Sequence, residues 1–217
     1  SAHTAMRHVD SNVYHEALKC LTKSHDQSLI LKADDLLKAL EENYLKEKSN
    51  TLHPQPQTYS HMLDAVPYID TEGEGVGLVE RVKDILGRVK IQESAGNPHV
   101  SMNTHIYNSA LNSLASIGER DPSAVNMVEE MLVNPSAELD KVSFSIAIKA
   151  ILSVKKMPIN DESSTASSAA TVEQLMIRME ALGLGHPNQQ MMTPILDSLS
   201  KQGSVKKILH LLEWMEA

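Results

Sequence analysis

Several kinds of residue are scarce in this sequence, and each scarcity excludes a class of protein. Cys20 is the single cysteine, which excludes an internal disulfide framework and a cysteine-rich zinc finger. Only 3% of residues are aromatic, and no apolar run approaches the roughly 18 residues that a membrane span needs. Acidic residues outnumber basic ones, and the formal net charge is −8. This balance argues against a strong non-specific binder of nucleic acids or of anionic membranes.

What the chain does contain is the periodicity of amphipathic helices, with no strand-like alternation of any length. In the segment 104–134, apolar residues recur at i, i+3, i+4 and i+7, which is one face of a helix; they are Tyr107, Ala110, Leu111 and Leu114. Gly118 is expected to end this helix, and Asp121-Pro122-Ser123 to begin a second one. The segment therefore predicts a helical hairpin with one apolar side. A single hairpin is too small to bury that side by itself.

The first helix of this hairpin occurs five times along the chain. Each copy begins with a large lead residue that is followed by apolar residues at the same spacing; the leads are Tyr14, Tyr59, Tyr107, Phe144 and Met192. Successive leads are 37 to 48 residues apart. A recurrent period of this kind is typical of a stacked array of helical repeats, so we expect an all-α fold.

The five copies divide the chain into repeats. We assign repeat 1 to residues 11–55, repeat 2 to 56–103, repeat 3 to 104–140, repeat 4 to 141–188 and repeat 5, truncated, to 189–217, with 1–10 as the tail of a preceding repeat. Residues 155–170, rich in Ser, Thr and Ala, are expected to form a mobile insert in repeat 4. Because helical periodicity continues to the last residues, we expect the chain to be part of a longer protein.

The hairpin resembles the pentatricopeptide repeat. The resemblance rests on an aromatic-Asn pair, a Gly turn and an Ala-x-x-Leu-x-x-x-Met second helix, seen in repeat 3 as Tyr107-Asn108, Gly118, Ala124 and Met131. The tetratricopeptide repeat is the nearest alternative, but its signature tryptophan and glycine are absent from these first helices. The resemblance implies a right-handed α-solenoid of about five hairpins, with the first helices lining a concave surface. It also implies a mitochondrial or plastid location, although no transit peptide is recognised here.

The same resemblance implies binding of single-stranded RNA, with one base read per repeat. Two residues per repeat select the base in that family. One follows the lead and the other closes the repeat; here they are His15, Ser60, Asn108, Ser145 and Thr193, and Gln55, Asn103, Asp140 and Asn188. All can form hydrogen bonds, as the reading of base edges requires. Ser, Thr, Asn and Asp are equally the usual residues of helix caps and turns, so each taken alone can be a cap.

Other family positions are only partly filled. Val142 is the one aliphatic residue at the position that sandwiches a base, and Lys23 and Lys201 match a lysine that often meets phosphate. With so few backbone cations, the contribution of counterion release to RNA affinity should be small. By resemblance, the pairs Ser60 with Asn103 and Ser145 with Asn188 imply adenine, and Asn108 with Asp140 implies uracil.

The sequence offers no support for catalysis. No nucleophile–base–acid constellation can be assembled and no metal-ligand spacing occurs, so we predict no enzyme activity, no cofactor and no metal site. Gly73, Gly75 and Gly77 lie in a segment that has neither the preceding strand nor the Lys-Ser/Thr of a phosphate loop. Two alternatives to RNA binding stay open: a protein-interaction scaffold in a larger ribonucleoprotein, and the repeat region of a larger enzyme.

Overall fold

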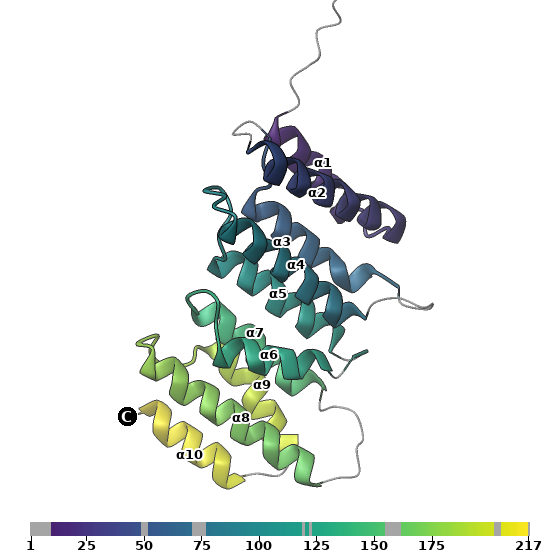
Figure 1. Cartoon of the computed structure of the whole chain (residues 1–217). Coiled ribbons are helices and arrows are strands. Elements are labelled where there is room, and N and C mark those ends of the chain that lie inside the picture. Colours follow the sequence, from purple (N-terminus) through teal and green to yellow (C-terminus); the bar gives the residue numbers. More distant parts are fainter. Residues whose placement is uncertain are drawn as a thin grey trace, which may run out of the picture. The chain divides into compact units, whose positions relative to one another are not determined.

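The computed structural model describes residues 10–48, 52–70, 77–118, 120–121, 123–154, 162–201 and 205–216. Within these ranges all regular structure is helical and no strand occurs, so the all-α prediction is confirmed (Figure 1). The chain forms two compact units, Ser1–Ser113 and Leu114–Ala217.

The first unit is built from helical hairpins. Its helices are α1 (Ser11–Lys23), α2 (Gln27–Glu47), α3 (Pro56–Ala65), the 3-10 helix η1 (Val66–Tyr68), α4 (Leu78–Ser94) and most of α5 (Thr104–Ile117). Helix α1 packs on α2 and on α3, and α3 packs in turn on α2 and α4 (Figure 1). The first helix of one hairpin therefore contacts both its own partner and the first helix of the next hairpin.

The second unit repeats this arrangement. Its helices are the end of α5, then α6 (Ser123–Val133), α7 (Lys141–Val154), α8 (Glu162–Ala181), α9 (Gln189–Lys201) and α10 (Val205–Glu216). Helix α7 packs on α6, α8 and α9, and α9 packs on α10. Both units thus have the character of helical repeats.

The apolar stripes of α3, α5 and α7 are buried as their spacing predicts, whereas in α1 only Leu18 of the stripe is buried. Leu18, Leu63, Leu111 and Phe144 are all fully buried. The same prediction is wrong for Leu196, which is only half-buried. The buried stripe of α9 runs through Met192, Ile195 and Leu199, and Leu196 lies at its edge.

Equivalent positions of successive hairpins in the first unit contact each other at both ends. At one end, the rings of His53 and His99, which precede α3 and α5, stack with centroids 3.7 Å apart. At the other end, His25 stacks on Tyr68 at 3.7 Å, and the Gln27 side chain exchanges two hydrogen bonds of 3.3 Å with the backbone of Asp70. These contacts join one hairpin to the next outside the apolar core.

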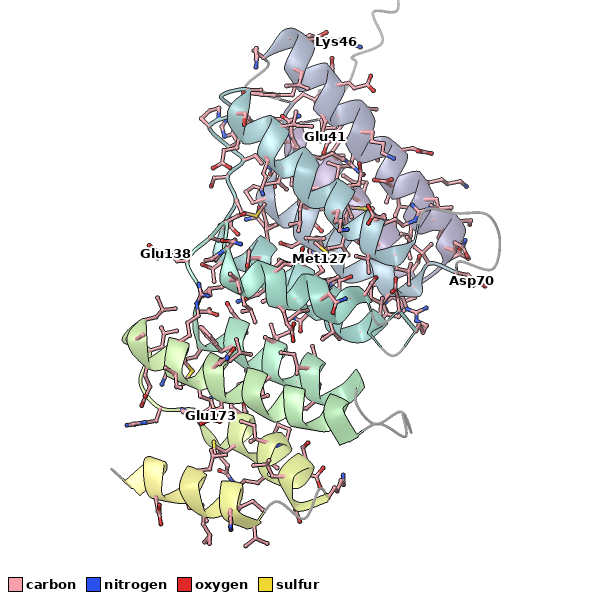
Figure 2. All side chains as sticks on the ribbon, turned by 60° about the horizontal axis from the view of Figure 1, so that its bottom comes forward. Glu41, Lys46, Asp70, Met127, Glu138 and Glu173 are labelled. Carbon is pink, nitrogen blue, oxygen red and sulfur yellow. The ribbon has the colours of Figure 1, made fainter. Side chains whose placement is uncertain are left out.

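A buried ionic network links the second helices α2 and α4. The guanidinium of Arg88 on α4 donates to both carboxylate oxygens of Glu41, at 3.2 and 2.9 Å, and to Asp34 at 2.5 Å. Arg88 and Glu41 are 8% and 6% exposed, and Glu41 lies at the contact between the two helices (Figure 2). Burial raises the pKa of Glu41 against the opposing attraction of Arg88. For Asp34, hydrogen bonds from Lys38 and Arg88 outweigh burial and lower the pKa.

The segment expected to be an insert in repeat 4 is in large part helical. Helix α8 begins at Glu162, so the prediction of a loop is wrong for residues 162–170, while 155–161 lie outside the described residues. Low hydrophobicity suggested a loop, but alanine has the highest helix propensity, and this stretch is rich in alanine. Residues 162–170 extend the helix that follows them, and extending a helix avoids the free-energy cost of nucleating a new one.

Candidate functional site

The first turns of the five first helices expose one side chain at the same position. The residues two places before each lead are all exposed; they are Asn12, Gln57, His105, Val142 and Gln190. Val142 stands out because it is aliphatic and still 54% exposed. The sequence placed Val142 at a base-sandwich position, and its exposure gives it the access which that role requires.

The residues that close the repeats are helix N-caps. Oδ1 of Asn103 accepts from the backbone N–H of Ile106 at 2.9 Å, and Oδ1 of Asn188 accepts from Met191 at 3.0 Å. Asp140 accepts from the Ser143 backbone at 2.8 Å and from its hydroxyl at 2.9 Å. These three residues therefore do act as helix caps, which was one of the two roles expected for them. Capping occupies one oxygen of each side chain and leaves the rest of its polar surface to other contacts.

Gln55 differs from the other closing residues. It precedes α3 but makes no side-chain cap. Its amide nitrogen instead donates to Oδ1 of Asn12 at 3.0 Å, which connects the close of repeat 1 to the exposed first turn of α1. Gln55 and Asn12 thus form one polar pair next to α1 and α3.

The residues that follow the leads do not share one environment. Asn108 and Ser145 are half-buried, and Thr193 is exposed, with its hydroxyl donating to the Gln189 carbonyl at 2.8 Å. His15 is half-buried and lies 3.1 Å from the Thr58 hydroxyl. Ser60 is fully buried, which argues against the base-reading role that the sequence suggested for it. The side chain that follows the lead of α3 points into the protein. The expectation that repeat 2 reads adenine therefore loses its support.

The two candidate phosphate ligands also differ. Lys23 is exposed at the end of α1, so its ammonium group is accessible to a phosphate. Lys201 is exposed too, but its ammonium pairs with Asp197 at 2.6 Å. This ion pair reduces the positive charge that Lys201 offers to a phosphate.

A group of histidines on the first helices was not singled out from the sequence. The rings of His15 on α1 and His61 on α3 stack with centroids 5.4 Å apart, and His105 on α5 is near enough to influence His61 electrostatically. Lys19 and Lys23 lie close to the same rings. The signal was present in the sequence, because these histidines recur with nearly the period of the leads. We refer to His15, His61 and His105 as the histidine row.

Two members of the histidine row, His15 and His61, favour the neutral state. Burial lowers the pKa of His61, and the charges of His15, Lys23, Lys19 and His105 lower it further. Burial likewise lowers the pKa of His15, where Lys19 acts in the same direction and Glu16 opposes it. The lowered pKa values of His15 and His61 favour their uncharged forms at neutral pH, beside Lys19 and Lys23.

This preference predicts a loss of stability in mild acid. The unfolded chain binds protons at the usual histidine pKa of 6.5, above the folded value, so the stabilising contribution is present above pH 6.5 and is lost as the pH falls below it. The melting temperature should therefore drop between about pH 7.5 and about pH 5.5. The drop should be smaller in His61→Gln than in the wild type, as measured by circular dichroism. His186→Gln, at an exposed histidine on the second unit, is the control. An equal drop in His61→Gln and the wild type would contradict the assignment.

The residues that the structure describes lack two features, a metal-binding cluster and a membrane-spanning helix. No group of three or more His, Cys, Asp or Glu side chains in this part of the chain is placed to hold a metal ion. Among the same residues, no helix has the length and hydropathy needed to cross a membrane.

Comparison with known proteins adds no family. No protein-family model matches the chain, and no curated protein matches it.

Proposed function

We propose that the chain is an α-solenoid of the pentatricopeptide type, right-handed and made of about five hairpins. The packing within each unit supports this, since α1, α3, α7 and α9 each contact their own second helix and a neighbouring first helix. The stack of His53 on His99 joins equivalent points of two adjacent hairpins, as is expected in a repeat array.

On this scaffold we propose that the first helices bind single-stranded RNA with sequence selectivity, in a mitochondrion or a plastid. The observation that carries the proposal is that all five first helices expose the first-turn residue two places before the lead, while α3, α5 and α7 bury the apolar stripe that follows it. A polar repeat-closing residue directly precedes α3, α5, α7 and α9. Asn188 illustrates the geometry best, because it is exposed and its cap uses only Oδ1. Its amide nitrogen remains a donor for a base edge.

A binding selection tests the function directly. The chain is incubated with random single-stranded RNA pools at two salt concentrations, and bound sequences are compared with the input. The proposal predicts enriched short motifs and a shallow dependence of affinity on salt, because few cations line the proposed surface. Absence of enrichment at both salt concentrations would contradict it.

Asn188→Asp should alter the selectivity of repeat 4. Aspartate caps a helix as well as asparagine does, so the bond to the Met191 N–H and the fold should be retained. A carboxylate only accepts, and it should favour guanine, which presents N1–H and amino donors, over adenine. The preference between two RNAs that differ at this base should shift by about 1–3 kcal/mol, on the scale known for base discrimination in DNA. Fluorescence anisotropy with labelled RNAs measures it.

The matched control is Asn134→Asp. Asn134 is exposed after α6, away from any repeat-closing position, and its replacement makes the same change of charge. It should leave the ratio of the two affinities unchanged. If Asn188→Asp and Asn134→Asp change the ratio equally, the effect belongs to net charge and not to base reading.

One observation favours a second function, that of a protein-interaction scaffold. Helix α10 exposes Val205, Leu209 and Leu212 at 62%, 55% and 41%, and the chain is acidic overall. Exposed apolar side chains on one helix are typical of a protein-binding surface. This function replaces RNA binding if the selection yields no motif and a protein ligand is found that Leu209→Ser releases.

A further inference from the structure

A cavity of about 380 Å³ opens in the first unit between α2, α3, η1 and α4. Its floor is apolar and includes the buried side chains of Met62, Val66 and Ile85. This volume falls within the range of about 300–1,000 Å³ that is usual for small-molecule sites. The second helices supply much of its wall, so it is separate from the first-turn residues considered for RNA.

The carboxylates at the rim of this cavity are already engaged. Asp34 pairs with Lys38 at 2.8 Å and with Arg88 at 2.5 Å, and Asp84 lies 3.5 Å from Arg88. Lys38, also at the rim, is held by its bond to Asp34. These pairs satisfy the acidic groups, and the rim has little remaining attraction for a cationic ligand.

Arg81 is the exception at this rim. It lines the cavity from α4, its Nε is buried, and among the described residues that atom has no hydrogen-bond partner. No salt bridge to Arg81 is formed within the described part of the chain either. A buried charged donor that lacks an acceptor is costly, and the guanidinium fork matches the geometry of a carboxylate.

We propose that this cavity binds a small amphiphilic carboxylate, with its apolar body on the floor and its carboxylate on Arg81. The apolar floor selects the body of the ligand, and the guanidinium of Arg81, whose Nε lacks a partner among the described residues, selects the charge and planarity of its head group. Arg88 has a buried Nη2 without a partner as well, but its charge is already balanced by Glu41 and Asp34. A bound anion would therefore supply the acceptor that Arg81 lacks among the described residues.

Calorimetric titration with decanoate, below its micelle concentration, tests the proposal on the wild-type chain. Decanoate should bind with one-to-one stoichiometry, and octyl glucoside, which has an apolar chain but a neutral head, should bind at least about tenfold more weakly. This comparison needs no variant. Failure of decanoate to bind, or equal binding of the two probes, would overturn the proposal.

Arg81→Met removes the charge and keeps much of the side-chain volume. It should weaken decanoate binding about tenfold or more, with little effect on octyl glucoside. Lys83→Met is the matched control, since Lys83 lies on the same helix outside the cavity and pairs with Glu80 at 2.7 Å. It should leave both affinities unchanged. Equal weakening by Arg81→Met and Lys83→Met would show that only net charge matters, and would overturn the site.

Leu31→Trp provides an independent variant if Arg81→Met fails to fold. Leu31 is half-buried and lines the cavity from α2, so the larger ring should occupy part of the space. Both decanoate and octyl glucoside should then bind more weakly, while the helical circular dichroism is retained. Unchanged decanoate binding in a folded Leu31→Trp chain would place the ligand elsewhere and overturn the proposal.

Discussion

Replacing Arg88 with methionine is expected to lower the free energy of unfolding by about 3–5 kcal/mol, the usual effect of removing one partner from a buried ion pair. The guanidinium is the shared partner of Glu41 and Asp34, and its side chain is only 10% exposed. Without it, a carboxylate that is itself 6% exposed loses both of its hydrogen bonds from Arg88. Urea unfolding followed by circular dichroism at neutral pH measures the difference.

A variant that removes the whole network separates lost charge pairing from lost packing. Arg88→Met combined with Asp34→Leu and Glu41→Leu should recover most of the stability, because apolar replacement of a buried ionic group is often neutral or stabilising. Lys19→Met, which breaks the exposed pair with Glu16, should change stability by less than about 1 kcal/mol. An effect of Arg88→Met as small as that of Lys19→Met would show that the network contributes no more than a surface pair.

Replacing Leu111 with alanine is expected to cost about 2–5 kcal/mol. Leu111 is fully buried on α5, together with Ala110 and Leu114 of the same stripe. Truncation removes apolar contacts and leaves a cavity that surrounding helices fill only in part. Thermal and urea unfolding of the variant and the wild type give the value.

Ile91→Ala is the matched surface control. Ile91 lies on α4 and is 57% exposed, so a comparable truncation there should change stability by about 0.5 kcal/mol or less. If Leu111→Ala is as mild as Ile91→Ala, the register assigned to α5 is wrong.

The helices could be predicted because their determinants are local. The spacing of Tyr107, Ala110, Leu111 and Leu114 fixes one face of a helix whatever surrounds it, and the structure buries all four. The burial of Phe144 and Leu18 follows from the same periodicity. The loop expected at residues 162–170 is helical instead, because the helix propensity of alanine outweighs the polar composition of this stretch.

The site was harder to predict because its determinants are not local. The inward direction of Ser60 and the stack of His15 on His61 depend on how α3 meets α1, which no spacing within one helix specifies. The same is true of Arg88, whose partners on α2 are far away in sequence. Single-helix periodicity predicts which face is buried, but it does not predict which polar groups meet between helices.

The capping bonds of Asn103, Asp140 and Asn188 have a consequence for protein engineering. Each side chain serves its helix through one oxygen that accepts a backbone N–H, and asparagine, aspartate and serine do this about equally well. These three residue types nevertheless present different donors and acceptors outward. Exchanging them at the three positions should therefore yield a library of chains with nearly equal melting temperatures and different polar surfaces. Such a library could be screened for new ligands without first being sorted for folding.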